Sequence, residues 1–158
     1  LTGVVLFQNQ VLDTNYTSGG YVSSSYTSSA VFFKHSKFNF ISINPISTAL
    51  RDIAELTMEY KATKDTLIVY AVHLKASDGS TNEQKRLAEV NNLRAVTDQL
   101  PVGTDYIVAG DFNIYSSYEP AFNALLDQSR KQRLSRQLHG LIQVPDPKLW
   151  LLAQWLKY

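Results

Sequence analysis

The stretch DYIVAGDFN, residues 105–113, leads from an apolar run directly into polar residues. The run before Gly110 is short and rich in side chains that favour strands, which predicts a buried strand. Gly110 permits a sharp bend because it has no Cβ. If the backbone stays extended beyond it, Asp111 and Asn113 point to one side and Phe112 points into the core. This strand end is therefore either an Asx-type turn or part of a binding site.

The residues before this stretch complete a strand–helix–strand unit. Residues 66–74, TLIVYAVHL, are almost continuously apolar and predict a strand buried on both faces. Residues 82–99 have apolar side chains every three or four positions, which predicts an amphipathic helix, and Ser80 and Glu83 have the spacing of a capping box. Because a strand, a crossover helix and a strand usually pair in parallel, the predicted fold class is mixed α/β.

The segments on either side predict further strands and a helix. Residues 13–29 are rich in Ser, Thr, Tyr and Gly and predict a surface loop. Three short strands are predicted over residues 30–34, 38–43 and 53–61. The first two are separated by HSK, which is the length of a hairpin turn, and the third is expected to pair antiparallel with residues 66–74. Pro120 is expected in the first turn of a helix.

Length and composition exclude several classes of protein. The chain has 158 residues, of which 44% are hydrophobic, and this suits one globular domain. It has no cysteine, which excludes disulfides, cysteine-ligated zinc and thiolate catalysis. No apolar run reaches about 18 residues, the length that a membrane-spanning helix needs. The first residues have no basic region or cleavage site of a signal peptide, and the start at Leu1 predicts a processed piece or a fragment.

Charge is distributed unevenly along the chain. Residues 1–127 contain 9 basic and 13 acidic side chains, whereas residues 128–158 contain 6 and 1. The basic segment is explained either by a solvated helix face or by contact with phosphate groups.

Polar residues follow two strands that are expected to be neighbours. Ligands of such sheets collect beyond the carboxyl ends of the strands, where His73, Asp111 and Asn113 are placed. A carboxylate and an amide suit Mg²⁺ or Mn²⁺ and a phosphoryl oxygen, and a histidine can donate to a phosphate oxygen or transfer a proton. The alternatives are a partly buried structural histidine and an Asx turn.

Three other residues are candidates for lesser roles. Arg51 suits bidentate binding of a phosphate, or else an ion pair with Asp52 or Glu55. Tyr115 is able to stack on a base or sugar of a substrate. Glu119 is assigned to the start of the last helix, where a carboxylate favours the helix dipole.

Several segments together resemble one known superfamily. They are RDIAELTMEY (51–60), IVYAVHLKAS (68–77), NEQKRLAEVNNLR (82–94) and YIVAGDFNIYSSYEPAFNALL (106–126). In this order and spacing they resemble the endonuclease/exonuclease/phosphatase superfamily of metal-dependent phosphodiesterases, and in particular a secreted bacterial subgroup. The resemblance covers about residues 28–127.

The resemblance implies a fold, a site and a cofactor. The fold is a two-sheet α/β sandwich of the deoxyribonuclease-like type, with mixed sheets and flanking helices, of which this chain holds a part. His73 matches the histidine that contacts the scissile phosphate, and Asp111 matches a carboxylate that orients water or binds Mg²⁺ or Mn²⁺. Asn113 matches an amide that holds a phosphate oxygen, and Arg51 matches an arginine without a firm role. A secreted or periplasmic location follows from the same resemblance.

Two departures from the family pattern limit these expectations. The Gln-Glu pair that supplies the family's main metal ligand and its closing Ser-Asp-His motif are both missing, and the only later histidine is His139. Residues 1–127 are therefore predicted to be a partial domain, and residues 128–158 a basic and apolar tail that does not match.

The predicted function is a metal-dependent phosphodiesterase or nuclease-like hydrolase with reduced or no activity. Its substrate is a phosphodiester, with nucleic acid, phospholipid and inositol phosphate left open. The alternative is a non-catalytic binding or assembly module that uses the scaffold and the basic tail. Open sheet edges also predict self-association.

Overall fold

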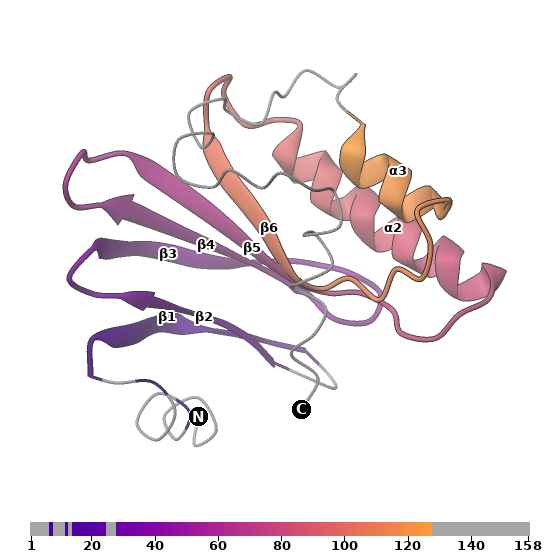
Figure 1. Ribbon diagram of the computed structural model, residues 1–158, viewed down its shortest axis with the longest axis horizontal. Helices are drawn as coiled ribbons and strands as arrows, with labels where there is room; N and C mark the ends of the chain where they lie inside the picture. The colour runs from indigo at the N-terminus through magenta and orange to yellow at the C-terminus, as the bar shows by residue number, and fades with distance from the viewer. Residues whose placement is uncertain (1–6, 8–11, 13, 25–27, 128–158) are drawn as a thin grey trace.

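The structure is a computed structural model that describes residues 7, 12, 14–24 and 28–127 (Figure 1). In chain order its elements are β1 (Tyr16–Ser23), β2 (Ser28–Lys34), β3 (Phe38–Ile46), β4 (Ile53–Tyr60), β5 (Thr66–His73), α2 (Ser80–Thr97), β6 (Asp105–Asp111) and α3 (Pro120–Leu126). The predicted tail, residues 128–158, and His139 within it lie outside the described residues.

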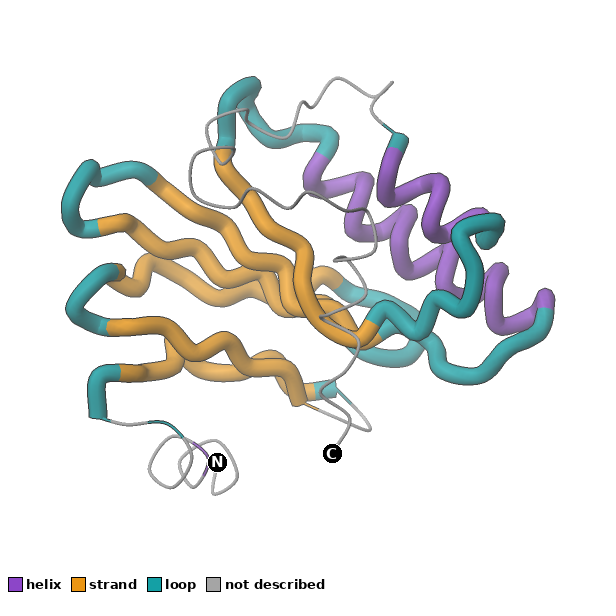
Figure 2. The backbone as a smooth tube through the Cα atoms, in the orientation of Figure 1, coloured by secondary structure: helices purple, strands orange, loops and turns teal. Residues whose placement is uncertain are grey.

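The strands form two sheets, which confirms the predicted α/β class with mixed sheets and flanking helices. The larger sheet has the order β3-β4-β5-β6, and the smaller one pairs β1 with β2. Strands β3, β4 and β5 are antiparallel neighbours, whereas β5 and β6 are parallel, as the strand–helix–strand pattern predicted. Both helices lie on one side of the larger sheet and the β1–β2 sheet lies on the other (Figure 2).

The sequence predicted the second strand, β2, but was wrong about the segment before it and about how β2 pairs. Residues 13–29 were expected to be a surface loop, but β1 occupies Tyr16–Ser23 and pairs antiparallel with β2. The expected hairpin across HSK is also wrong, because β2 and β3 belong to different sheets. Strand β1 has the composition of a loop because it passes close to β3 and needs small residues there. A Cβ at Gly19 would collide with the ring of Phe40 in β3.

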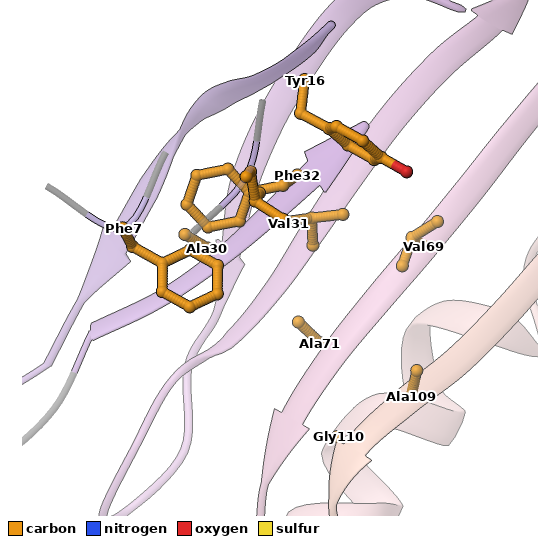
Figure 3. A pocket seen from close by; sticks show the side chains of 10 residues that line it. Phe7, Tyr16, Ala30, Val31, Phe32, Val69, Ala71, Ala109 and Gly110 are labelled. Carbon is orange, nitrogen blue, oxygen red and sulfur yellow. The ribbon is translucent and has the colours of Figure 1, made fainter. Parts of the chain in front are cut away.

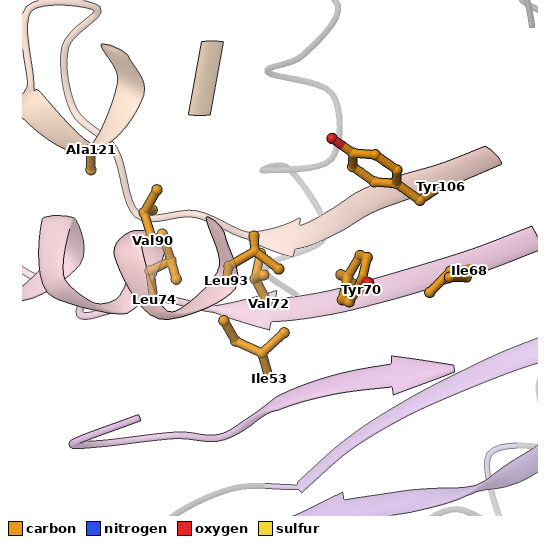
Figure 4. Close-up of a cluster of buried hydrophobic side chains, with 9 residues drawn as sticks. All are labelled: Ile53, Ile68, Tyr70, Val72, Leu74, Val90, Leu93, Tyr106 and Ala121. Atoms are coloured by element: carbon orange, nitrogen blue, oxygen red, sulfur yellow. The ribbon is translucent and has the colours of Figure 1, made fainter. Parts of the chain in front are cut away.

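The main core lies between the larger sheet and the helices. From β5 it receives Tyr70 and Val72, and from α2 it receives Val90 and Leu93, all at most 4% exposed (Figure 4). The intervening side chains of β5 face the smaller sheet and are only partly buried. The expectation that this strand is buried on both faces is therefore correct for the helix side alone.

Helix α2 confirms the predicted apolar stripe but not the predicted cap. It begins at Ser80 after Gly79, and no side chain caps its first turn, so the capping box is wrong. Gly79 has a φ of 90°, a conformation that suits glycine and lets the chain enter the helix without a side-chain cap. Within the described residues no helix is long and apolar enough to cross a bilayer.

Candidate active site at the ends of strands β5 and β6

His73 and Asp111 are brought together by the parallel pairing of β5 with β6. They are the last register partners of the two strands, and Nε2 of His73 lies 3.8 Å from Oδ2 of Asp111. Both side chains are partly exposed, at 34% and 26%. Because Val72 and Leu74 point into the helix-side core, strand alternation turns His73 to the opposite face of the sheet. The predicted neighbourhood of the two side chains is thus present in the fold.

Gly110 is required for this close approach. Its φ is 136°, and a Cβ at this position would collide with the carbonyl oxygen of Val72 in the neighbouring strand. Only a glycine combines that backbone conformation with that contact. The residue before Asp111 is therefore fixed by the geometry of the strand pair.

The backbone turns directly after Asp111, so of the two alternatives left open by the sequence the extended one is not formed. Oδ1 of Asp111 accepts the N–H of Asn113 at 3.1 Å, and Asn113 has a φ of 49°. Nδ2 of Asn113 donates to the carbonyl oxygen of Leu74 at 3.0 Å, and the residue is only 6% exposed. Phe112 packs against the helix-side core, as predicted. The Asx-type turn is therefore present, and it lies within the candidate site.

Arg51 supports the backbone at the end of β5. Its Nε donates to the carbonyl oxygen of His73 at 2.9 Å, and its Nη2 donates to that of Leu74 at 2.7 Å. Asp52, one of its expected ion-pair partners, instead accepts the N–H of Thr48 at 3.0 Å. Two of the guanidinium nitrogens thus serve the main chain beside His73, and binding of a substrate phosphate by Arg51 stays a prediction.

Tyr115 lies on the loop that follows Asp111 and contacts the loop that follows His73. Its hydroxyl accepts the N–H of Ser77 at 3.1 Å. The guanidinium carbon of Arg86 lies 5.3 Å from the centre of its ring, within the range of a cation–π contact. The residue is 60% exposed, so one part of the ring is open to solvent. Stacking of this ring on a substrate stays a prediction.

Sequence reasoning missed three buried charged residues on α2, namely Arg86, Glu89 and Arg94, and underestimated one beyond β6. Arg86 and Glu89 are 0% and 4% exposed, and Glu119, which was assigned to the helix start, is 3% exposed. One signal was available for Arg86: positions 86, 90, 93 and 97 share one face of a helix, and the last three are apolar or small enough to be buried. An arginine on such a face is expected to have a buried partner.

Burial changes the titration of Glu89. Its Oε2 accepts the N–H of Lys75, two residues after His73, at 2.8 Å. Removal from water raises the pKa of Glu89 above its usual value, and the bond from Lys75 and the nearby charges of Arg51 and Arg86 offset only part of that rise. The carboxyl thus reinforces the loop after β5 at an electrostatic cost.

The described residues do not complete a metal site. Asp111 and Asn113 were predicted as ligands, but Oδ1 of Asp111 already accepts an N–H, and the amide nitrogen of Asn113 is directed to a carbonyl. Among the residues that the structure describes, no group of three or more His, Asp or Glu side chains could hold a metal ion. Asp111 alone provides a carboxylate at this strand end, which is part of the donor set that Mg²⁺ requires.

An apolar hollow of about 390 Å³ lies beside the candidate site. It is bounded by side chains from the β1–β2 side, including Tyr16 and Phe32, and by Val69, Ala71 and Ala109 of the larger sheet (Figure 3). Ala71 and Ala109 precede His73 and Asp111 by two positions and therefore share their face of the sheet. The candidate site thus lies at one end of an apolar inter-sheet surface.

Comparison with known proteins supports the fold. No protein-family model matches the chain, and no curated protein matches it. Among solved structures, the catalytic domain of human Nocturnin with bound sulfate matches at a TM-score of 0.63 and 21% identity, over 78% of this chain and 52% of that one.

Two structures from Bacteroides thetaiotaomicron are similar to a comparable degree. An endonuclease/exonuclease/phosphatase family protein matches at a TM-score of 0.62 and 15% identity, over 79% of this chain and 50% of that one. A mannosyl-6-phosphatase matches at a TM-score of 0.62 and 15% identity, over 79% of this chain and 52% of that one. The chain therefore spans about half the length of these structures.

Proposed function

Because the chain has the fold of the endonuclease/exonuclease/phosphatase superfamily, we propose that it is part of a hydrolase of phosphate esters with His73 and Asp111 at its reacting centre. The observation that carries this proposal is the 3.8 Å separation of their side chains at the ends of two parallel strands. Such strand ends are the usual place for ligands on α/β sheets. Both side chains are also partly open to solvent, so a phosphate group has access to them.

The two side chains suit complementary steps of phosphoester hydrolysis. The carboxylate of Asp111 orients a water molecule and accepts its proton as the water oxygen bonds to phosphorus. His73 donates a hydrogen bond to a non-bridging oxygen, where negative charge increases as the ester bond to the leaving oxygen breaks. The leaving oxygen takes a proton from solvent. These assignments place both groups on one side of the substrate phosphate.

We also propose that the reaction depends on Mg²⁺ or Mn²⁺, with Asp111 as one ligand. Such an ion would offset the negative charge of the phosphoryl group. The remaining ligands would be water, substrate oxygens or residues beyond the described ones, since a single carboxylate is an incomplete set. Calorimetric titration with each ion should give binding to the wild-type chain and none to Asp111→Ala. Equal binding to both chains would place the ion elsewhere.

The activity test uses the whole 158-residue chain with Mg²⁺ or Mn²⁺. Bis-p-nitrophenyl phosphate, p-nitrophenyl phosphate and a single-stranded oligonucleotide separate diester, monoester and nucleic-acid substrates. We expect Asp111→Ala and His73→Ala each to lower turnover by about 10²–10⁴-fold, as for loss of a group that transfers protons or stabilises charge.

Matched controls exist for both substitutions. Asp65→Ala and His35→Ala change an exposed aspartate and an exposed histidine in turns of the same fold, and we expect them to leave turnover unchanged. Turnover that survives both Asp111→Ala and His73→Ala would refute the assignment of the site.

A second candidate function is a non-catalytic binding or assembly module. The observation that favours it is the incomplete metal donor set among the described residues. Binding of an oligonucleotide without turnover in either metal ion would support this candidate. Weaker binding at higher salt would identify phosphate contacts as its source.

A further inference from the structure

Arg86 lies beneath the loop that follows His73. It projects from α2, is 0% exposed, and donates from Nη1 to the carbonyl oxygens of Lys75 and Ser77, each at 2.8 Å. One guanidinium nitrogen therefore holds two carbonyl groups of residues 74–79, the segment between β5 and α2. This loop begins at the residue directly after His73.

The same guanidinium also holds the loop that follows Asp111. Its Nε donates to Oε2 of Glu119 at 2.8 Å, and Glu119 is itself only 3% exposed. The other carboxylate oxygen of Glu119 accepts the N–H of Tyr115 at 2.8 Å. Residues 112–119, which connect β6 to α3, are thus fastened to Arg86 through one carboxylate.

Tyr115 adds a second link between the two loops. Its hydroxyl accepts the N–H of Ser77, and its ring packs against the guanidinium of Arg86. The Arg86–Glu119 pair and Tyr115 therefore connect residues 74–79 with residues 112–119 through charged and neutral contacts in one cluster.

We propose that the buried Arg86–Glu119 ion pair is a clamp that fixes these two loops against each other and so holds His73 beside Asp111. This inference rests on the proposed function, and it makes Arg86 and Glu119 positioning residues that act through the loops. A buried ion pair contributes little stability compared with well-packed apolar side chains, whereas breaking it leaves a buried charge alone. Its physical advantage here is geometric, because a rigid guanidinium serves three acceptors on two loops at fixed angles.

The wild-type chain tests the clamp without any substitution. We expect the amide hydrogens of Lys75, Ser77, Asn113 and Tyr115 to exchange through one shared opening, with protection factors within about tenfold of one another and the same denaturant dependence. Separate openings of the two loops, with unequal denaturant dependence, would overturn the proposal.

The Glu119→Gln variant tests the coupling directly. It keeps an oxygen for the N–H of Tyr115 but removes the charge that pairs with Arg86. We expect exchange at Ser77, on the other loop, to become at least about tenfold faster. Glu83→Gln is the control, since it changes a carboxyl in the first turn of α2 and should leave Ser77 unchanged. Faster exchange confined to residues 112–119 would also overturn the clamp.

Turnover provides a readout that a purely structural role would not change. In folded Glu119→Gln and Arg86→Lys chains we expect kcat to fall at least about tenfold with KM within about twofold, because loosened positioning affects the transition state. Leu93→Ala weakens the core on the same helix without removing any hydrogen bond of either loop, and we expect it to keep kcat while folded. Equal losses of kcat in all three variants would contradict a positioning role for Arg86 and Glu119. If the chain shows no turnover, the proposed function fails. The exchange experiments still test whether Arg86 and Glu119 clamp the two loops together.

Discussion

The Nε atom of Arg51 donates a hydrogen bond to the carbonyl oxygen of His73 at 2.9 Å. Arg51, two residues before the start of strand β4, therefore supports the residue that ends strand β5. This contact attaches the backbone of the candidate catalytic histidine to the segment between β3 and β4, while its side chain stays directed toward Asp111.

Substitution of Arg51 should reduce stability more than a change at the surface does. Arg51→Ala removes two charge-assisted bonds to main-chain oxygens, and we expect the free energy of unfolding to fall by about 2–3 kcal/mol in urea denaturation. Lys64→Ala, which removes an exposed ion pair with Glu59, should cost less than about 1 kcal/mol. Equal effects of the two substitutions would show that the bonds from Arg51 contribute no more than a surface pair.

Gly110 and Gly103 form a matched pair for backbone strain. Both have positive φ, at 136° and 88°, but a Cβ at Gly110 meets the Val72 carbonyl whereas one at Gly103 meets nothing within 4 Å. We expect Gly103→Ala to cost about 1–2 kcal/mol from strain alone and Gly110→Ala about 3 kcal/mol or more. Thermal unfolding of both variants measures the difference. Similar losses would show that the contact with Val72 is relieved by a small shift.

Asp111→Asn separates the turn from the charge at this position. The amide oxygen of asparagine is able to accept the N–H of Asn113, so we expect stability within about 1 kcal/mol of wild type. Loss of the charge should lower turnover by about 10²-fold or more, since the amide cannot accept a proton. Denaturation and turnover are measured on the same preparation. A large loss of stability would mean that the charge itself supports the turn.

Glu89 should make stability depend on pH. Since burial raises its pKa in the folded state, the folded chain holds its proton at pH values where the unfolded chain has released it. The contribution of this group to stability is complete below the unfolded-state pKa and is lost as pH rises through the folded-state pKa. Glu89→Gln has no such loss, and its amide oxygen still suits the N–H of Lys75.

We therefore expect the unfolding free energy of Glu89→Gln, relative to that of wild type, to increase from pH 4 to pH 7. Urea denaturation at intervals of about one pH unit measures this difference. Gln84→Ala, an exposed change on the same helix, gives the baseline. If wild type instead gains stability relative to Glu89→Gln as pH rises, the nearby charges of Arg51 and Arg86 outweigh the burial of Glu89.

Local periodicity was enough to predict the central unit of the fold. The apolar runs of β5 and β6 and the stripe on α2 each determine one element, and the usual parallel pairing of two strands joined by a crossover helix then places His73 beside Asp111. Strand β1 was not predicted because Ser, Thr and Gly dominate its sequence. The pairing of β2 was predicted wrongly because strand pairing is a long-range choice that a three-residue connection does not reveal.

Side-chain partners were harder to predict than elements. Arg51 and Asn113 converge on the carbonyl of Leu74 from positions 23 and 39 residues away in the chain. Arg86 and Glu119 are separated by 33 residues. Such partners depend on how finished elements pack, and no local pattern of charge or hydropathy encodes them. The Asx turn at Asp111 was the exception, because it closes within two residues.

The parallel register between β5 and β6 has a kinetic consequence. Strand β5 pairs with β4 across a short turn, so we expect His73 to join a local hairpin early in folding. We expect Asp111 to arrive later, because β6 pairs with β5 across the whole intervening helix. Closing that longer loop is entropically slower. Recovery of the proposed turnover during refolding should consequently lag behind the earliest gain of secondary structure.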